Sequence, residues 1–317
     1  MHGVDIAIEC DEPTLLSRLQ GRLAPFRARF EEDLEAQLQF EFRIAEAGNR
    51  IKEVPGPLRT VYRVAEIEFR YDTKDDLLWV SCGNRLIGVC YPNLGVARFE
   101  VGADAAADLE LYSQTAFTIC LIELMKRQGR FSLHAAGISV GGAGILFAGP
   151  SGAGKSTLAI LLMQSLGKRA GFLGDDMLFL SAGTGDIKIL GWPEQIAVGE
   201  FTQRSVLGGE ARLQVTATGR RKGQIAASRI AGSNPAFNAG PEVIIFPRVT
   251  GWAKSVLTPI SQDEALLELA PNVLLTEATS SRAHLAALGA LARRCRCYRL
   301  EAGSDIVGLR RLLLTLI

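Results

Sequence analysis

A glycine-rich stretch near the middle of the chain constrains the fold more than any other feature of the sequence. An apolar run of strand length, residues 145–148, leads directly into GPSGAGKS, residues 149–156, which fits the pattern G-x-x-x-x-G-K-[ST]. Apolar residues then recur at helical spacing up to residue 166, and Gly167 can cap the helix. The sequence therefore predicts a strand, a phosphate-binding loop and a helix in immediate succession.

The residue types of this loop match the chemistry of phosphate binding. The backbone amides of a glycine-rich turn converge on phosphate oxygens, and the following helix directs its positive dipole end at the same anion. We expect Lys155 to reach the β- and γ-phosphates and the Ser156 hydroxyl to ligate Mg²⁺. A plain glycine turn between a strand and a helix is the alternative, and the strand–loop–helix context favours phosphate binding.

Two adjacent aspartates, Asp175 and Asp176, lie between two short apolar runs. Neighbouring carboxylates are costly to bury unless a positive group lies beside them, and a Mg²⁺ ion at the phosphate loop would satisfy that need. An Asp-Asp turn between strands is the alternative. Because Ser156 lies only nineteen residues upstream of Asp175, we favour a role in holding the metal or in proton transfer.

Composition excludes several classes of protein. The chain has 317 residues, of which 48% are hydrophobic, and a formal net charge of +1. It can therefore bury one large or two ordinary domains, and we expect neither disorder nor nucleic-acid binding through bulk positive charge. No apolar run has the length of a membrane span, and the N-terminus lacks the pattern of a secretory signal. Six cysteines without a C-x-x-C pair fit a cytoplasmic protein.

The first hundred residues predict a small, sheet-rich α/β module with no catalytic constellation. Asp104 is expected to cap a long helix over residues 105–128, so we place a domain boundary near residue 103. We expect residues 1–103 to recognise a substrate or partner and residues 104–317 to be catalytic. The acidic run at residues 31–33 is interpreted as a solvated face. The expected elements before the boundary are a helix at 13–24 and strands at 4–9, 38–45, 61–71, 77–81, 86–91 and 96–101.

In the second domain, the segment before the phosphate loop predicts a β-hairpin. Two apolar runs flank Gly141-Gly142, so the loop belongs to a sheet unlike that of doubly wound folds. Residues 191–238 are expected to be irregular. Their basic cluster, residues 220–223, can hold phosphates or an acidic substrate, although a basic surface turn is favoured. Further expected elements are a strand at 243–247 ended by proline, helices at 264–269, 283–294 and 304–316, and a strand at 296–301.

These segments together resemble the catalytic domain of HPr kinase/phosphorylase, a relative of the ATP-dependent phosphoenolpyruvate carboxykinases. The likeness is carried by His134 before the hairpin, by the loop from Gly149 to Ser156, and by the Asp175-Asp176 pair. It covers about residues 105–317 and is closer to HPr-kinase-related proteins found beside peptide-modification and protein-sorting genes. The resemblance implies an α/β fold in which a P-loop domain with a mixed sheet follows a smaller sheet-rich α+β domain.

The resemblance also implies roles for individual residues. Asp175 would be the base that takes the proton of the acceptor hydroxyl, with Asp176 and Ser156 near Mg²⁺, although the two aspartates could exchange these roles. His134 would lie beside the transferring phosphoryl group; a histidine that closes a strand by hydrogen bonds is the alternative. The family usually has Glu after the Lys-Ser of the loop, where this chain has Thr157, and we do not find the segment associated with phosphorolysis. The implied ATP contacts are Gly149, Pro150, Ser151, Gly152, Ala153, Gly154, Lys155, Ser156 and Thr157.

The sequence therefore predicts a kinase that transfers the γ-phosphoryl group of ATP to a serine or threonine of a protein or peptide. A small metabolite as acceptor is the first alternative. The second is a nucleotide-dependent switch or scaffold without phosphotransfer. An ABC-type ATPase is disfavoured because no L-S-G-G-Q stretch is present. The acceptor and the oligomeric state stay open, with a homo-oligomer as one option.

Overall fold

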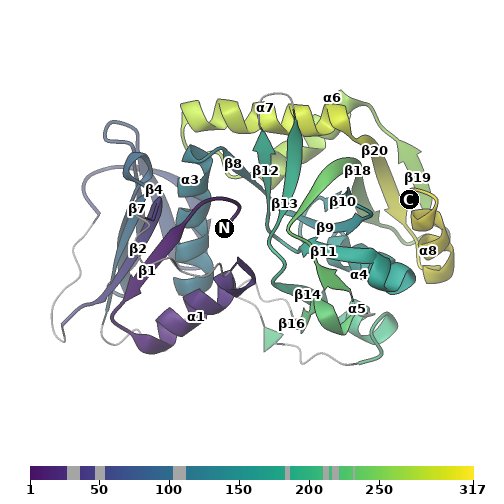
Figure 1. The fold of residues 1–317 in the computed structure, drawn as a ribbon, viewed down its shortest axis with the longest axis horizontal. Helices are drawn as coiled ribbons and strands as arrows, with labels where there is room; N and C mark the ends of the chain where they lie inside the picture. The colour runs from purple at the N-terminus through teal and green to yellow at the C-terminus, as the bar shows by residue number, and fades with distance from the viewer. Residues whose placement is uncertain are drawn as a thin grey trace. The chain divides into compact units, whose positions relative to one another are not determined.

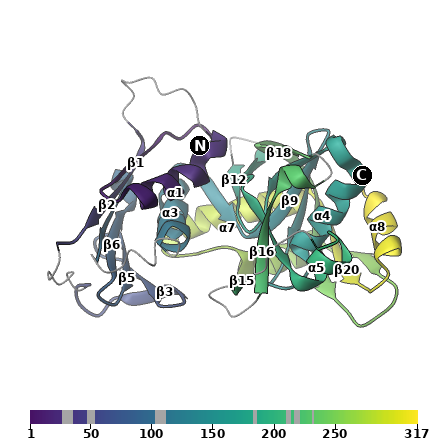
Figure 2. The same cartoon turned by 90° about the horizontal axis from the view of Figure 1, so that it is seen from below.

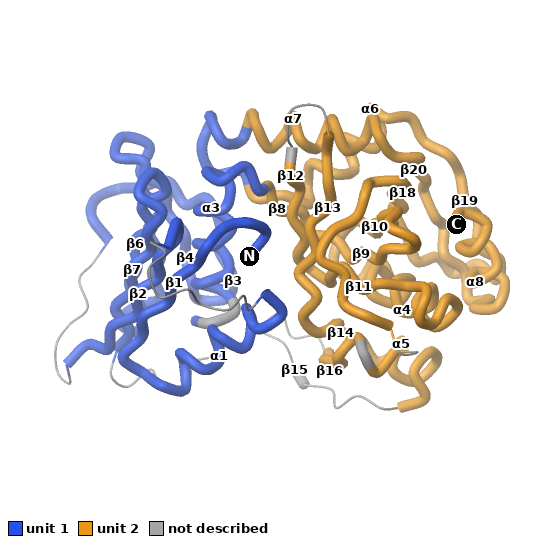
Figure 3. Tube along the Cα trace, in the orientation of Figure 1, with its two compact units in different colours: residues 1–130, 275–281 blue, residues 131–274, 282–317 orange. Residues whose placement is uncertain are grey.

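A computed structural model describes residues 1–26, 36–46, 54–102, 112–182, 186–209, 214–215, 221–230 and 233–317. The chain forms two compact units (Figure 3). Unit 1 comprises Met1–Arg130 and Leu275–Ser281, and unit 2 comprises Phe131–Leu274 and Arg282–Ile317. Unit 1 thus extends past the boundary that we expected near residue 103. The acidic run at 31–33 and the predicted cap Asp104 lie outside the described residues.

The described part of unit 1 contains a seven-stranded mixed sheet with the order β1-β2-β7-β6-β5-β4-β3 (Figure 1). β1, β2 and β7 are parallel neighbours, and the remaining neighbours are antiparallel. The single strand expected at 61–71 is two strands, because the chain turns at Ala65, which has a φ of 48°. The strands are β1 (Ile6–Cys10), β2 (Leu38–Ile44), β3 (Arg59–Val64), β4 (Ile67–Asp72), β5 (Leu77–Cys82), β6 (Leu86–Tyr91) and β7 (Val96–Val101).

Two helices, α1 (Pro13–Leu23) and α3 (Phe117–Arg127), lie on the same face of this sheet (Figure 1). The Glu12 side chain caps α1 and Leu15 and Leu19 are fully buried under it. A π-helical turn at Tyr112–Ala116 precedes α3, so the described part of the predicted long helix is not regular. Phe117 packs its ring against Phe40 of β2, with centroids 4.7 Å apart. α3 therefore belongs to the core of unit 1, which explains why this unit runs beyond residue 103.

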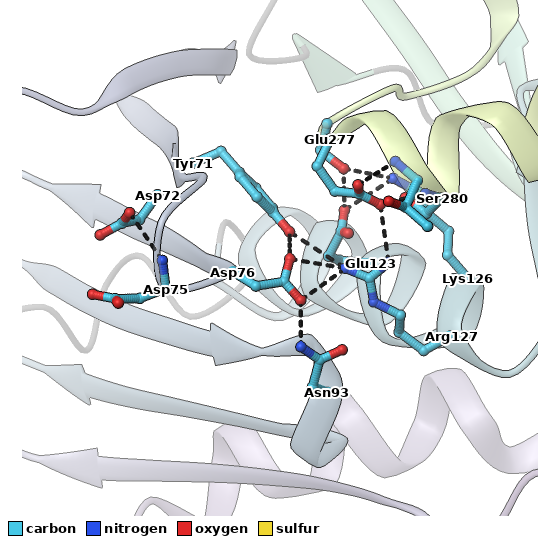
Figure 4. A network of polar contacts seen from close by, with 12 residues as sticks. Tyr71, Asp72, Asp75, Asp76, Asn93, Glu123, Lys126, Arg127, Glu277 and Ser280 are labelled. Carbon is cyan, nitrogen blue, oxygen red and sulfur yellow. Dashed lines mark hydrogen bonds and ion pairs between the residues drawn. The ribbon is translucent and has the colours of Figure 1, made fainter.

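A polar network fixes the C-terminal half of α3 within unit 1 (Figure 4). Arg127 donates to both carboxylate oxygens of Asp76, at 2.9 and 3.1 Å, and to Glu277 at 2.9 Å. The ammonium of Lys126 lies 2.9 Å from the Glu123 carboxylate, and side chains of this pair are 1% and 0% exposed. The Thr276 hydroxyl also donates to the Glu123 carboxylate, at 2.7 Å. Residues 275–281 are therefore held to α3 by charged and hydrogen-bonded groups, although they are distant from it in sequence.

The described part of unit 2 contains a ten-stranded mixed sheet with the order β17-β11-β9-β10-β18-β13-β12-β8; β20 also pairs with β18, and β19 pairs with β20. The predicted hairpin is confirmed as β9 and β10, which pair antiparallel, whereas β10 and β18 are parallel. The strands are β8 (Arg130–Leu133), β9 (Ala135–Val140), β10 (Ala143–Ala148), β11 (Ala170–Gly174), β12 (Leu178–Ala182), β13 (Ile187–Gly191), β17 (Asn234–Pro235), β18 (Asn238–Val249), β19 (Val256–Pro259) and β20 (Arg296–Ala302).

Helices cover both faces of this sheet (Figure 1). Ile145 and Phe147 of β10 belong to one buried cluster, together with residues of α4 and α8, whereas Leu146 and Ala148 belong to a second cluster with α6 and α7. This alternation is the period of a strand buried on both sides. The helices are α4 (Lys155–Leu166), α6 (Gln262–Leu269), α7 (Ala278–Arg294, which begins in unit 1) and α8 (Ile306–Leu314).

The expectation that residues 191–238 are irregular is wrong for much of the segment. A small antiparallel sheet forms there, with the order β14-β16-β15, beside the short helix α5 (Glu200–Ser205) (Figure 2). Its buried Ile196, Val198 and Ile225 join the cluster that contains α4, so this sheet is part of the core of unit 2. The strands are β14 (Gln195–Gly199), β15 (Gln214–Val215) and β16 (Arg221–Ala226).

Other local expectations are confirmed or corrected by single residues. Ser261 and Glu264 form the predicted capping box at the start of α6. Pro247 does not end the predicted strand, because β18 continues to Val249 in parallel register with β20. Among the described residues, none of the helices has both the length and the apolar character needed to cross a bilayer.

The buried Glu123–Lys126 pair yields a stability prediction. Glu123→Ala leaves the Lys126 ammonium buried without its counter-ion, which is expected to destabilise the protein by about 3–5 kcal/mol. The double variant Glu123→Leu/Lys126→Met removes both charges and is expected to recover most of this loss. Urea unfolding of the full chain measures both effects. This interpretation is contradicted if Glu123→Ala lowers the free energy of unfolding by less than about 1 kcal/mol, or if the double variant lowers it more than Glu123→Ala does.

Candidate functional site

The loop after β10 has backbone conformations that glycine supplies. Gly149, Gly152 and Gly154 have φ values of 146°, 89° and 100°, which side-chain-bearing residues rarely adopt. α4 begins directly afterwards, and Gly154 at its N-cap position offers no side-chain cap. The first amides of a helix have no acceptor within the helix itself. The predicted succession of strand, glycine loop and helix is therefore confirmed, and its geometry suits an anion.

The ammonium of Lys155 turns back into the loop. Its Nζ donates to the carbonyl oxygens of Gly149 at 2.8 Å and Pro150 at 3.3 Å, and lies 3.1 Å from Nε2 of His134. Lys155 is 5% exposed. Burial lowers the pKa of Lys155, while the charges of Asp176 and Asp175 oppose this change. Lys155 is therefore a buried ammonium group whose cost of burial is partly offset by the negative charges of Asp175 and Asp176.

His134 lies between β8 and β9, and its hydrogen bonds fix its tautomer. Nδ1 is 2.9 Å from the carbonyl oxygen of Asp176, and since a carbonyl only accepts, Nδ1 carries the proton. Nε2 then accepts from Lys155. Burial and the charge of Lys155 lower the pKa of His134, with Asp176 opposing them. His134 is therefore a neutral imidazole at pH 7 that orients the lysine.

Asp175 joins the loop helix to the small sheet. Its Oδ1 accepts from the Ser156 hydroxyl at 2.9 Å, and its Oδ2 accepts from the Ala197 amide of β14, also at 2.9 Å. Burial, followed by repulsion from Asp176, raises the pKa of Asp175 to about 7, although these two hydrogen bonds and Lys155 act in the opposite direction. A carboxyl group with such a pKa can exchange protons near neutral pH.

Asp176 points in a different direction because of its backbone. Its φ of 66° is in the left-handed region, which aspartate tolerates better than most residues. The side chain is 51% exposed, and its Oδ1 lies 3.9 Å from Nε2 of His134. The turn thus separates two sequence neighbours: Asp175 contacts the loop helix, and Asp176 faces solvent beside His134.

The donor set at this point fits Mg²⁺. A hydroxyl from Ser156 and carboxylates from Asp175 and Asp176 are hard oxygen ligands, and Mg²⁺ is usually held by one or two carboxylates, water and substrate phosphates. The raised pKa of Asp175, caused by burial and by Asp176, identifies negative charge that a cation would stabilise. Among the described residues, no three His, Cys, Asp or Glu side chains form a metal-binding group by themselves. The residues therefore suit a metal that phosphates help to hold.

The structure brings Lys155, Ser156, His134, Asp175 and Asp176 together, as the sequence predicted. Two further contributions were not expected. The Ala197 amide was missed because backbone groups leave no sequence signal, and Thr202 of α5 bonds to Thr157 at 2.6 Å between hydroxyl oxygens.

A further contribution comes from Lys222, which belongs to the basic cluster at 220–223, for which phosphate binding was the less favoured of two interpretations. The interpretation of that cluster as a surface turn is wrong for its described residues, because β16 begins at Arg221. Arg220 lies outside the described residues. The charge of Lys222 lowers the pKa of both Lys155 and His134, after the larger effect of burial.

Solved structures similar to this chain exist, whereas neither the family models nor the curated proteins match its sequence. One similar structure is that of the HPr(Ser) kinase/phosphatase from Coxiella burnetii. The alignment covers 58% of this chain and 92% of the Coxiella chain, at 12% sequence identity and a TM-score of 0.32. At this TM-score the alignment does not establish a common fold. The fold that is shown is a mixed α/β fold with several sheets.

The raised pKa of Asp175 predicts a pH-dependent stability. Between the ordinary aspartate pKa near 3.9 and about 7, the folded protein holds a proton that the unfolded chain releases. Stability is therefore expected to fall as pH rises through this interval. Asp175→Asn removes the titrating group, so its thermal midpoint should fall less than that of the wild type between pH 5 and pH 8, in buffer with EDTA.

The exposed Asp186→Asn is the matched control and should behave like the wild type. An equal fall in thermal midpoint for Asp175→Asn and for the wild type would contradict the effect of burial on Asp175.

Proposed function

We propose that this chain is an ATP-dependent kinase that transfers the γ-phosphoryl group to a serine or threonine hydroxyl of a protein or peptide. The observation that supports this most is the 2.9 Å hydrogen bond from Ser156 to Asp175. It joins a carboxylate of raised pKa to the first turn of the loop helix. A phosphate-binding loop and a proton acceptor are the two parts that phosphoryl transfer needs.

In this proposal, the loop binds the phosphates of ATP. The amides of the glycine loop and of the first turn of α4 would donate to phosphate oxygens. Lys155 would leave the carbonyls of Gly149 and Pro150 and donate to the β- and γ-phosphates instead. Bound Mg²⁺ would supply charge neutralisation, held by Ser156 and Asp176. The proposed ATP contacts are Gly149, Pro150, Ser151, Gly152, Ala153, Gly154, Lys155, Ser156 and Thr157.

Asp175 would act as the base. It accepts the proton of the acceptor hydroxyl while the hydroxyl oxygen forms a bond to the γ-phosphorus and the bond to the β-phosphate oxygen breaks. A base with a pKa of about 7 is matched to neutral pH. His134, as a neutral imidazole, would keep the Lys155 ammonium beside the transferring group. The loop and its neighbouring donors thus stabilise negative charge, and one carboxyl group moves the proton.

The proposed fold of residues 104–317 is that of the HPr kinase/phosphorylase and phosphoenolpyruvate carboxykinase group. It is supported by the antiparallel hairpin that leads into the loop and by the Asp pair that follows β11. Residues 1–103 are proposed to recognise the acceptor protein or another partner.

The proposal predicts that Asp175→Asn separates binding from transfer. ATP affinity should change little, because the phosphate-binding donors are intact, whereas phosphotransfer should fall by about 10²-fold or more. Incubation with labelled ATP and a lysate of the source organism, followed by identification of the labelled band, measures transfer. Isothermal titration measures affinity, with Asp186→Asn as the control that should retain both activities.

Undiminished transfer by Asp175→Asn would refute its role as the base. A label on a small metabolite would replace the protein acceptor with a small-molecule acceptor. ATP binding by the wild type without transfer to any hydroxyl would overturn the kinase proposal in favour of a nucleotide-dependent switch.

A further inference from the structure

The small sheet of unit 2 carries a lysine whose position relative to the loop follows from strand register. β16 pairs antiparallel with β14, and Lys222 lies opposite Gly199, the last residue of β14. The next residue along the chain, Glu200, opens α5. Lys222 is therefore at the end of the small sheet where β14 passes into α5.

Two hydrogen bonds connect this end of the small sheet and the adjoining α5 to Asp175 and to the loop helix α4, respectively. Two residues before Gly199, the amide of Ala197 donates to Asp175 at 2.9 Å. Three residues after Gly199, the hydroxyl of Thr202 lies 2.6 Å from that of Thr157, the third residue of α4. Gly199 lies between Ala197 and Thr202 in sequence. Lys222, which pairs with Gly199, is therefore held close to the start of α4. Figure 2 shows the same arrangement, with β16 beside α5 and near α4.

The Lys222 side chain lies on the polar face of β16. Its neighbours Gly223 and Ile225 alternate with it along the strand and are buried, and Ile225 belongs to the core cluster of α4. Lys222 is half-buried on the opposite face. Its positive charge acts on two groups of the site, since it contributes to the lowered pKa of both Lys155 and His134.

The ammonium groups of Lys155 and Lys222 repel each other in a partly buried site. An anion that contacts both groups would stabilise them. The groups on which Lys222 acts, Lys155 and His134, are those proposed to surround the transferring phosphoryl group. The bound anion nearest to them would be the terminal phosphate of the nucleotide. The α-phosphate and the nucleoside would lie farther away along the triphosphate.

We propose that Lys222 is a second cationic ligand of the nucleotide, contributed by the small sheet, and that it binds the terminal phosphate of ATP. This inference rests on the proposed binding of ATP at the loop. A lysine provides a compact charge with three donors, which suits a phosphate of changing geometry. Lys222 therefore gives the site a preference for a triphosphate over a diphosphate, because ADP lacks the group that it contacts.

The test compares ATP and ADP affinity by isothermal titration of the full chain with Mg²⁺. Lys222→Met is expected to weaken ATP binding by about 10- to 100-fold, the loss of a charged hydrogen bond, and to weaken ADP binding by less than about 3-fold. Lys222→Arg keeps the charge and should retain most of the preference for ATP. The control is Lys188→Met, which removes an exposed lysine of β13 and should bind both nucleotides like the wild type.

An ATP-to-ADP affinity ratio that is the same in Lys222→Met and in the wild type overturns this inference while the proposed function stands. A wild-type protein that binds neither nucleotide overturns the proposed function and this inference together. Thermal unfolding of each variant checks that it is folded, and Lys222→Gln repeats the comparison if the methionine variant is not.

Discussion

The Asp175 carboxylate accepts two hydrogen bonds on which the geometry of the whole candidate site depends. One comes from Ser156 at the start of the loop helix, and the other comes from the amide of Ala197 in the small sheet. A half-buried carboxylate needs such donors, since an unpaired charge that is partly removed from water is costly. The same residue therefore has hydrogen-bond donors for its own charge and connects β14, which is followed by α5 and paired with β16, to the start of the loop helix.

Burial also sets the charges of this site. It raises the pKa of Asp175 and lowers the pKa values of Lys155 and His134, so the charged form of each group is disfavoured. An anionic phosphate would stabilise the lysine, and a divalent cation would stabilise the two carboxylates. The charges of a nucleotide and its metal are thus complementary to those that the protein buries here. This complementarity is the physical reason for proposing phosphoryl transfer at the site.

The sequence predicted the features that depend on local patterns. The hairpin followed from the apolar runs around Gly141 and Gly142, and the loop and α4 followed from residues 149–166. The small sheet was missed because its strands are short and its register depends on contacts with α4, such as that between Thr157 and Thr202. Similarly, the place of α3 in unit 1 depends on the distant Phe40, which no local pattern reveals.

The central claim is that Asp175 and the loop act on the same phosphoryl group. A crystal structure of the full chain with Mg²⁺ and a non-hydrolysable ATP analogue measures this directly. We predict that the γ-phosphate contacts Lys155 and that the Asp175 carboxylate lies within about 6 Å of the γ-phosphorus, with room for a hydroxyl about 3–3.5 Å from the phosphorus. A nucleotide bound away from the loop, or an Asp175 carboxylate more than about 10 Å from the γ-phosphorus, would contradict the claim, because no hydroxyl could then contact both.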